Sequence, residues 1–177
     1  VFTHRTLDTV PIHDREPDEK NSAGEIDGIS YSLRHFLKLA ENGNPNLLAL
    51  IFAPEQFWVS HTEAGKILME NAGLFVSMQA APKFKGYMQS QLLRLQGLKN
   101  GHKPNRPEIV EKYGYDVKYA AAVARLGMQG GEFFETGTIA SPMHPNDIHM
   151  IMRIKNGAFS YDECIHLLES FEGEMLA

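Results

Sequence analysis

Residues 82–99 read PKFKGYMQSQLLRLQGLK, and this stretch decides the fold class. Apolar side chains recur in it every three or four positions, which is the spacing of one face of an α-helix. The stripe consists of Phe84, Tyr87, Met88, Gln91, Leu92, Leu95 and Leu98. This periodicity predicts a long helix whose apolar side chains lie in the core.

The N-terminal quarter contains a strand candidate, residues 25–30, ahead of the first helical pattern. Ser30 is placed to cap the helix that follows, and we expect that helix to end at Gly43, which can adopt the left-handed conformation. Asn46 is then typical of the cap of a second helix. These elements predict an α+β fold in which the remnant of a small mixed sheet packs on a mainly helical C-terminal region.

The C-terminal half contains further helical patterns. Asp116 is expected to cap a helix with small residues on one face, and the Gly130-Gly131 pair is expected to interrupt that helix. Pro145 argues against a helix in its neighbourhood. A final amphipathic helix is expected after Ser160.

Composition narrows the class of protein. The chain has 177 residues, 43% hydrophobic and 22% charged, which suits one domain with a core or a small domain packed on a helical one. Its formal net charge is −5, so a site for a polyanion must be local. Cys164 is the single cysteine, which excludes an internal disulfide and predicts a cytoplasmic location. No apolar run approaches the roughly 20 residues of a membrane helix.

Three segments stand out together. They are YSLRHFLKLA at 31–40 followed by GNPN at 43–46, GYMQSQL at 86–92, and KYGYDVK at 112–118. In this order they resemble a YcgL-like family of predicted nucleotidyltransferases of bacteria and phages, related to DNA polymerase beta. The resemblance covers most of the chain from about Asp27, and RIKNG at 153–157 is similar to the family's C-terminal part.

The resemblance implies a division of the chain and a reaction. Residues 1–60 would be a partial nucleotidyltransferase palm, which supplies the sheet remnant, and residues 61–177 a helical region. The complete enzyme would transfer a nucleoside monophosphate from a triphosphate such as ATP to a hydroxyl acceptor. The expected partners are a nucleoside triphosphate and a nucleic-acid acceptor, and the expected cofactor is Mg²⁺.

The resemblance also implies a catalytic centre of three carboxylates, because two Mg²⁺ ions about 4 Å apart need hard oxygen ligands. Asp27 matches the third position and is the candidate catalytic and metal-binding residue, although the same residue can be a simple strand-end residue. The Gly-Ser element and the paired carboxylates that would precede it are not found in the 177 residues. In relatives a stretch like Val1-Phe2 directly follows that motif, so we expect that this hairpin was cut away or is supplied by another chain.

Two interpretations follow for activity. The isolated chain is expected to be inactive in nucleotidyl transfer, because Asp27 alone cannot position two metal ions. The alternative is a noncatalytic or split subunit that binds a nucleotide, a nucleic acid or a partner chain carrying the missing hairpin. A structural interaction domain is a third interpretation.

The predicted nucleotide-binding residues are Lys112, Tyr115, Asp116, Lys118 and Arg125. Lys118 and Arg125 are seven residues apart, two helical turns, and therefore share one face. Positive groups so placed could receive a triphosphate. The structural alternatives are an N-cap role for Asp116 and an ordinary solvated face for the cations.

Three further observations bear on this site. Relatives often carry His four residues after Lys118, where this chain has Ala122, so any contact made by that His is absent. Lys155 is treated as distant from the site. Two basic patches could hold a nucleic-acid backbone or could simply be solvated. They are Arg34 with Lys38, and the connector residues Lys99, His102, Lys103 and Arg106.

Overall fold

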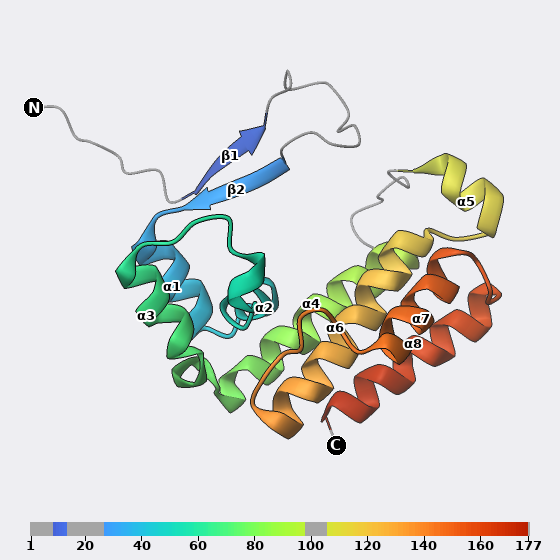
Figure 1. Cartoon of the computed structure of the whole chain (residues 1–177). Helices are drawn as coiled ribbons and strands as arrows, with labels where there is room; N and C mark the ends of the chain where they lie inside the picture. The colour runs from blue at the N-terminus through green and yellow to red at the C-terminus, as the bar shows by residue number, and fades with distance from the viewer. Residues whose placement is uncertain (1–8, 14–26, 98–105, 177) are drawn as a thin grey trace, which may run out of the picture.

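The computed structural model describes residues 9–13, 27–97 and 106–176. In these ranges the chain is mainly α-helical, and its helices form two groups (Figure 1). We call α1 to α3 with the strands the N-terminal lobe, and α4 to α8 the bundle. The elements are β1 (Thr9–His13), β2 (Asp27–Tyr31), α1 (Leu33–Glu41), α2 (Pro45–Ile51), α3 (Glu63–Glu70), α4 (Ala81–Leu95), α5 (Pro107–Tyr113), α6 (Val117–Thr136), α7 (Pro145–Lys155) and α8 (Tyr161–Leu176).

The two strands pair antiparallel, with Thr9 opposite Tyr31 and His13 opposite Asp27. The predicted strand at 25–30 is confirmed for the residues that the structure describes, and it continues to Tyr31. The mixed sheet is not confirmed, because the sheet in the described ranges contains only β1 and β2. A mixed sheet needs a third strand to combine parallel and antiparallel pairs.

The caps of the first two helices differ from the predicted ones. Ser32, not Ser30, caps α1, and its hydroxyl accepts from the His35 amide at 3.3 Å. Asn44, not Asn46, caps α2, and its side-chain oxygen accepts from the Asn46 amide at 3.0 Å. The cap of α2 lies at Asn44 because the next residue, Pro45, suits the first helical position. A proline has no amide N–H, so it needs no hydrogen-bond acceptor there.

The turn between α1 and α2 packs directly on the start of α4. Gly43 has φ +71°, and a Cβ atom there would lie 2.5 Å from the Cα of Ala80. A side chain at this position would therefore be both strained and too close to the neighbouring backbone. Gly43 thus fixes the beginning of α2 against the beginning of α4.

The amphipathic pattern of α4 is confirmed. Phe84, Met88 and Leu95 are buried, and Leu92 packs against the same core. Leu98 lies outside the described residues. Four members of the predicted stripe therefore mark the face of α4 that packs in the core, whereas Tyr87 and Gln91 are half-buried at its edge.

The expected interruption of α6 at Gly130-Gly131 is wrong. The helix continues to Thr136. A Cβ atom on Gly130 would collide with Met175 of α8 and would lie 2.9 Å from the Phe84 ring of α4. Gly130 is therefore required by close helix packing, which offsets its weak helix propensity.

Prolines begin two helices that the sequence pattern missed. Pro145 was expected to exclude a helix, yet it is the first residue of α7. Pro107 likewise begins α5. Proline is tolerated at these positions because the first amides of a helix have no intrahelical acceptor. The final helix, expected after Ser160, is confirmed as α8.

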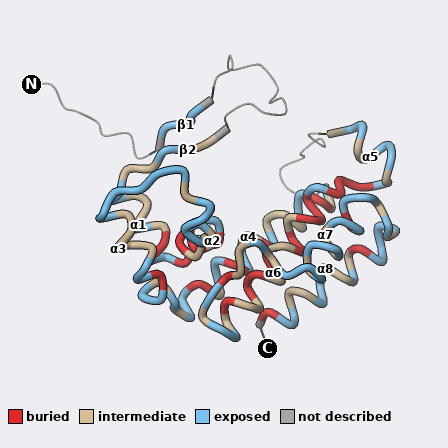
Figure 2. Tube along the Cα trace, viewed as in Figure 1, coloured by how far each residue is buried: buried red, intermediate tan, exposed pale blue. Residues whose placement is uncertain are grey.

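The main core lies where α4, α6 and α8 meet, and the buried residues concentrate there (Figure 2). Phe84 and Phe133 stack in its centre with their ring centroids 5.9 Å apart. The lobe has a smaller separate cluster around Leu47 and Ile51. Among the described helices, none is long and apolar enough to cross a membrane.

Candidate functional site

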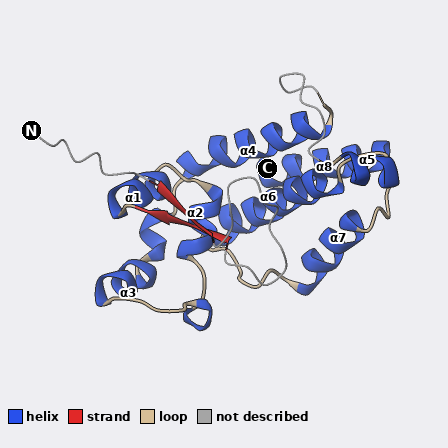
Figure 3. Cartoon of the chain, turned by 90° about the horizontal axis from the view of Figure 1, so that it is seen from above, coloured by secondary structure: helices blue, strands red, loops and turns tan. Residues whose placement is uncertain are grey.

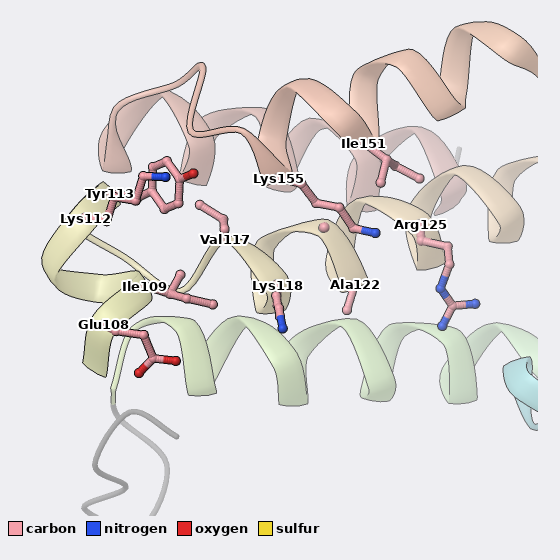
Figure 4. A pocket seen from close by; sticks show the side chains of 11 residues that line it. Glu108, Ile109, Lys112, Tyr113, Val117, Lys118, Ala122, Arg125, Ile151 and Lys155 are labelled. Carbon is pink, nitrogen blue, oxygen red and sulfur yellow. The ribbon is translucent and has the colours of Figure 1, made fainter. Parts of the chain in front are cut away.

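A cavity of about 790 Å³ opens between α5, α6 and α7 (Figure 4). Both charged and apolar side chains line it. They are Glu108, Ile109, Lys112, Tyr113, Val117, Lys118, Ala121, Ala122, Arg125, Ile151 and Lys155. This set includes three of the five predicted nucleotide-binding residues, and these three come from two different helices.

The helix geometry of α6 explains how two of the cations meet. Lys118, Ala122 and Arg125 follow one another at intervals of four and three residues, so they occupy one face of the helix. Figure 4 shows all three side chains on the same side of α6. The last residue of α7, Lys155, extends its amine between Lys118 and Arg125 in the same view.

Arg125 is the most constrained of these cations. Its Nη1 donates to Oε1 of Gln129 at 2.7 Å, and its Nη2 donates to Oδ1 of Asn46 at 3.2 Å. Both acceptors are neutral amides. The guanidinium is half-buried, and desolvation by burial lowers the pKa of Arg125. A partly desolvated cation held by neutral oxygens retains an uncompensated charge that favours an anion.

The other lining cations also lack carboxylate partners. Among the described residues, no carboxylate lies within 4.0 Å of Lys118, Lys155 or Arg125 in an ion pair. The lining contains four cationic side chains and one carboxylate, Glu108. The cavity is thus a local positive region in a chain whose formal net charge is −5.

The opposite end of the cavity is aromatic and aliphatic. Lys112 places its amine 4.8 Å from the centroid of the Tyr113 ring. Gly157, with φ +69°, lies so close to this ring that a Cβ atom would overlap it. The contact holds the end of α5 against the turn after α7. Ile109 adds to this apolar end, whereas Ile151 lies near Arg125 at the other end of the cavity (Figure 4).

Tyr115 and Asp116 lie outside this cavity, in a smaller one of about 140 Å³. The Tyr115 hydroxyl donates to the Phe159 carbonyl at 3.0 Å, and burial raises the pKa of Tyr115. Asp116 accepts from the Lys118 amide at 3.0 Å and pairs with Arg106 at 3.0 Å. The N-cap role of Asp116 is confirmed, and both side chains are buried in structural contacts. A nucleotide contact by either one stays a prediction.

The basic patches fall in different places. Arg106 forms an ion pair with Asp116. The described residues do not include Lys99, His102 or Lys103. Arg34 and Lys38 are exposed on α1. None of these is among the residues that line the cavity.

Eight lining residues were not among the predicted nucleotide-binding residues, and two of them, Lys155 and Ala122, bear on the charge of the site. Lys155 was predicted to lie far from the site, yet α7 packs beside α6 and brings it into the cavity. Ala122 lines the cavity as well, so a histidine at this position would face the other cations. The helical spacing from Lys118 is enough to place Ala122 at the cavity. The position of Lys155 could not be predicted in this way, because it depends on how α7 packs against α6.

A family model described as "RlaP: RNA repair pathway DNA polymerase beta family" matches residues 1–172. The chain belongs to this polymerase beta family. The relation to DNA polymerase beta is thereby confirmed, while the narrower resemblance to YcgL-like proteins of bacteria and phages stays a prediction. A search of the curated proteins found no match. A search of the solved structures also found none.

Membership of this family indicates nucleotidyltransferase chemistry, which in polymerase beta families generally uses divalent metal ions. Asp27 is the first residue of β2 and pairs with His13 through the backbone. Within the described ranges, no group of three or more His, Cys, Asp or Glu residues could hold a metal ion. The catalytic and metal-binding roles of Asp27 stay predictions.

Proposed function

We propose that this chain serves nucleotidyl transfer, in which a nucleoside monophosphate passes from a nucleoside triphosphate to a hydroxyl group, and that the cationic cavity holds the triphosphate. The family's description names an RNA repair pathway, and we therefore propose a nucleic acid as the source of the hydroxyl group. Lys118, Arg125 and Lys155 would contact phosphate oxygens. The apolar end near Ile109 and Tyr113 would receive the nucleoside.

One observation carries this proposal: the half-buried guanidinium of Arg125 faces the same cavity as Lys118 and Lys155, and its hydrogen-bond partners among the described residues are neutral. Such a group is already oriented and partly desolvated before the ligand arrives. Its attraction for an anion is therefore stronger than that of a fully hydrated surface cation. A triphosphate offers several oxygens that can satisfy three cations at once.

The chemistry that these cations would assist is a displacement at the α-phosphorus. The acceptor hydroxyl oxygen forms a bond to this phosphorus, and the bond from the phosphorus to the oxygen bridging to the β-phosphate breaks. Pyrophosphate leaves with the electron pair, and the hydroxyl proton passes to water. Lys118, Arg125 and Lys155 would hold the triphosphate and stabilise the negative charge that grows on pyrophosphate.

Titration calorimetry with nucleoside triphosphates tests the binding step. Lys118→Ala and Arg125→Ala should each weaken binding about ten- to a hundredfold, because each removes one charge-assisted contact worth roughly 1.5 to 3 kcal/mol. Lys66→Ala is the matched control, since this lysine lies on α3 and pairs with Glu70. Equal affinity in the parent and all variants would refute the assignment of the cavity.

Transfer itself is tested by incubating the protein with α-labelled triphosphate, Mg²⁺ and oligonucleotide acceptors. Labelled acceptor whose yield falls in Lys118→Ala and Arg125→Ala supports the enzyme. Triphosphate binding through these residues without any transfer is the result expected of the isolated chain, and it supports an enzyme that lacks its catalytic hairpin and a noncatalytic or split subunit equally. The alternative shares the cavity with the enzyme and differs only in the chemical step.

A further inference from the structure

A second hollow, an open groove of about 600 Å³, runs along one side of α4. The residues that line it recur every three or four positions, so they form one face of the helix. They are Pro82, Lys83, Gly86, Tyr87, Ser90, Gln91 and Arg94. This face adjoins the buried one, which carries Phe84, Met88 and Leu95, and the half-buried Tyr87 belongs to the edge between them.

The groove has a cation at each end. Lys83 and Arg94 are three helical turns apart, about 16 Å along the axis. Neither side chain has an ion pair with a carboxylate in the part of the chain that the structure describes. In contrast, Lys85 of the same helix lies 3.9 Å from Glu172 of α8. The groove is therefore lined by the two cations of α4, Lys83 and Arg94, that form no ion pair with a carboxylate among the described residues.

The surface between the two cations suits a polymer with flat rings. Gly86 contributes no side chain, which leaves room, and Tyr87 contributes an aromatic side chain. Grooves that combine separated cations with an aromatic group bind single-stranded nucleic acids, whose phosphates contact the cations and whose bases stack on the aromatic group. An acidic protein segment would satisfy the charges but would make no use of the aromatic surface.

The groove and the cationic cavity meet at the same turn of the N-terminal lobe. The Asn44 side chain donates to the Tyr87 hydroxyl at 2.8 Å, so this turn reaches the groove. Asn46, two residues later, accepts from Arg125 at 3.2 Å, so the same turn reaches the cavity. The two views agree that α2 lies beside the bundle near the start of α4 (Figures 1 and 3).

We propose that the α4 groove binds the acceptor as a single strand of nucleic acid, with backbone phosphates on Lys83 and Arg94 and its reactive hydroxyl directed toward the turn at Asn44. This inference rests on the proposed function and adds to it the place and the class of the acceptor. A strand in the groove and a triphosphate in the cavity would approach one another at the α2 turn. Asn44 and Asn46 would then be positioning residues, one for each ligand.

Fluorescence anisotropy with short labelled single-stranded RNA and DNA of one sequence tests the groove. The double variant Lys83→Ala/Arg94→Ala should bind at least tenfold more weakly than the parent. The slope of log affinity against log salt should fall by about 0.7 for each lost phosphate contact. Lys85→Ala, on the same helix but on the α8 side, should stay within twofold of the parent.

The result that overturns the inference is a parent that binds neither strand, or a double variant with the parent's affinity and salt slope. Stronger binding of a duplex than of either strand would also contradict it. Calorimetry with a triphosphate on the same variants separates the two proposals. Strand binding through Lys83 and Arg94 without triphosphate binding in the cavity would defeat the proposed function alone. Triphosphate binding through Lys118 and Arg125 with no strand in the groove would defeat this inference alone.

Discussion

The two halves of α6 differ in charge and in packing. Its first half presents Lys118 and Arg125 to an open cavity, and small side chains such as Ala120 and Ala124 are buried in the core. Its second half faces a different groove of about 580 Å³, whose charged lining residues are all carboxylates. They are Glu132, Glu135, Asp147 and Glu174. The difference shows that a net charge of −5 does not describe any one surface, because a single helix carries a cationic site and an acidic groove.

Reversing one charge at each end of α6 tests this difference most strongly. Lys118→Glu should weaken triphosphate binding by about a hundredfold or more, because it replaces an attractive contact by a repulsive one. Glu135→Lys adds the opposite charge 17 residues away, about 25 Å along the axis, where salt screens it. Calorimetry should show less than a twofold change for Glu135→Lys. Comparable effects from both reversals would mean that binding follows net charge.

Packing in the second half of α6 offers a matched pair of glycines. Gly130→Ala should destabilise the fold by about 1 to 3 kcal/mol, because Met175 and Phe84 leave no space for a methyl group. Gly131→Ala, at the next position, meets open space and should be neutral or stabilising, since alanine favours a helix. Thermal unfolding followed by circular dichroism measures both. Similar melting temperatures for the two variants would contradict the close approach of α6 and α8.

Alkaline pH should weaken the contact between the Tyr115 hydroxyl and the Phe159 carbonyl. Burial, together with a hydrogen bond to Cys164, raises the pKa of Tyr115 above that of the unfolded chain, about 10. The stabilisation is therefore complete below pH 10 and declines as the pH rises from 10 toward the higher pKa of the folded state. Urea unfolding between pH 8 and 11 should show a steeper loss for the parent than for Tyr115→Phe. Equal slopes would exclude a contribution from this hydroxyl.

The smallest effect is expected from a substitution at Ala122, where relatives often carry histidine. Ala122→His would place an imidazole between Lys118 and Arg125. Triphosphate affinity should rise as the pH falls below about 6.5, because only the protonated ring adds a positive charge. Ala122→Gln is the uncharged control. A gain that does not depend on pH would indicate simple hydrogen bonding.

The sequence could predict what depends on periodicity and local chemistry. The stripe of α4, the Asp116 cap and the shared face of Lys118 and Arg125 all follow from helical spacing. It failed at Gly130 and Pro145, because the same residues that interrupt a helix elsewhere are accepted where packing or an N-terminal position suits them. It also missed Lys155 and Asn46, whose places in the site depend on how α7 and α2 pack against α6.

The most direct test of the cationic cavity compares the affinities of nucleoside tri-, di- and monophosphates for the parent and for Arg125→Ala. The parent should lose affinity with each phosphate removed, because fewer oxygens reach Lys118, Arg125 and Lys155. In Arg125→Ala the ratio of triphosphate to monophosphate affinity should fall about tenfold or more, since one contact to the phosphates is missing. The same ratio in both proteins would contradict the claim that this cavity binds the triphosphate.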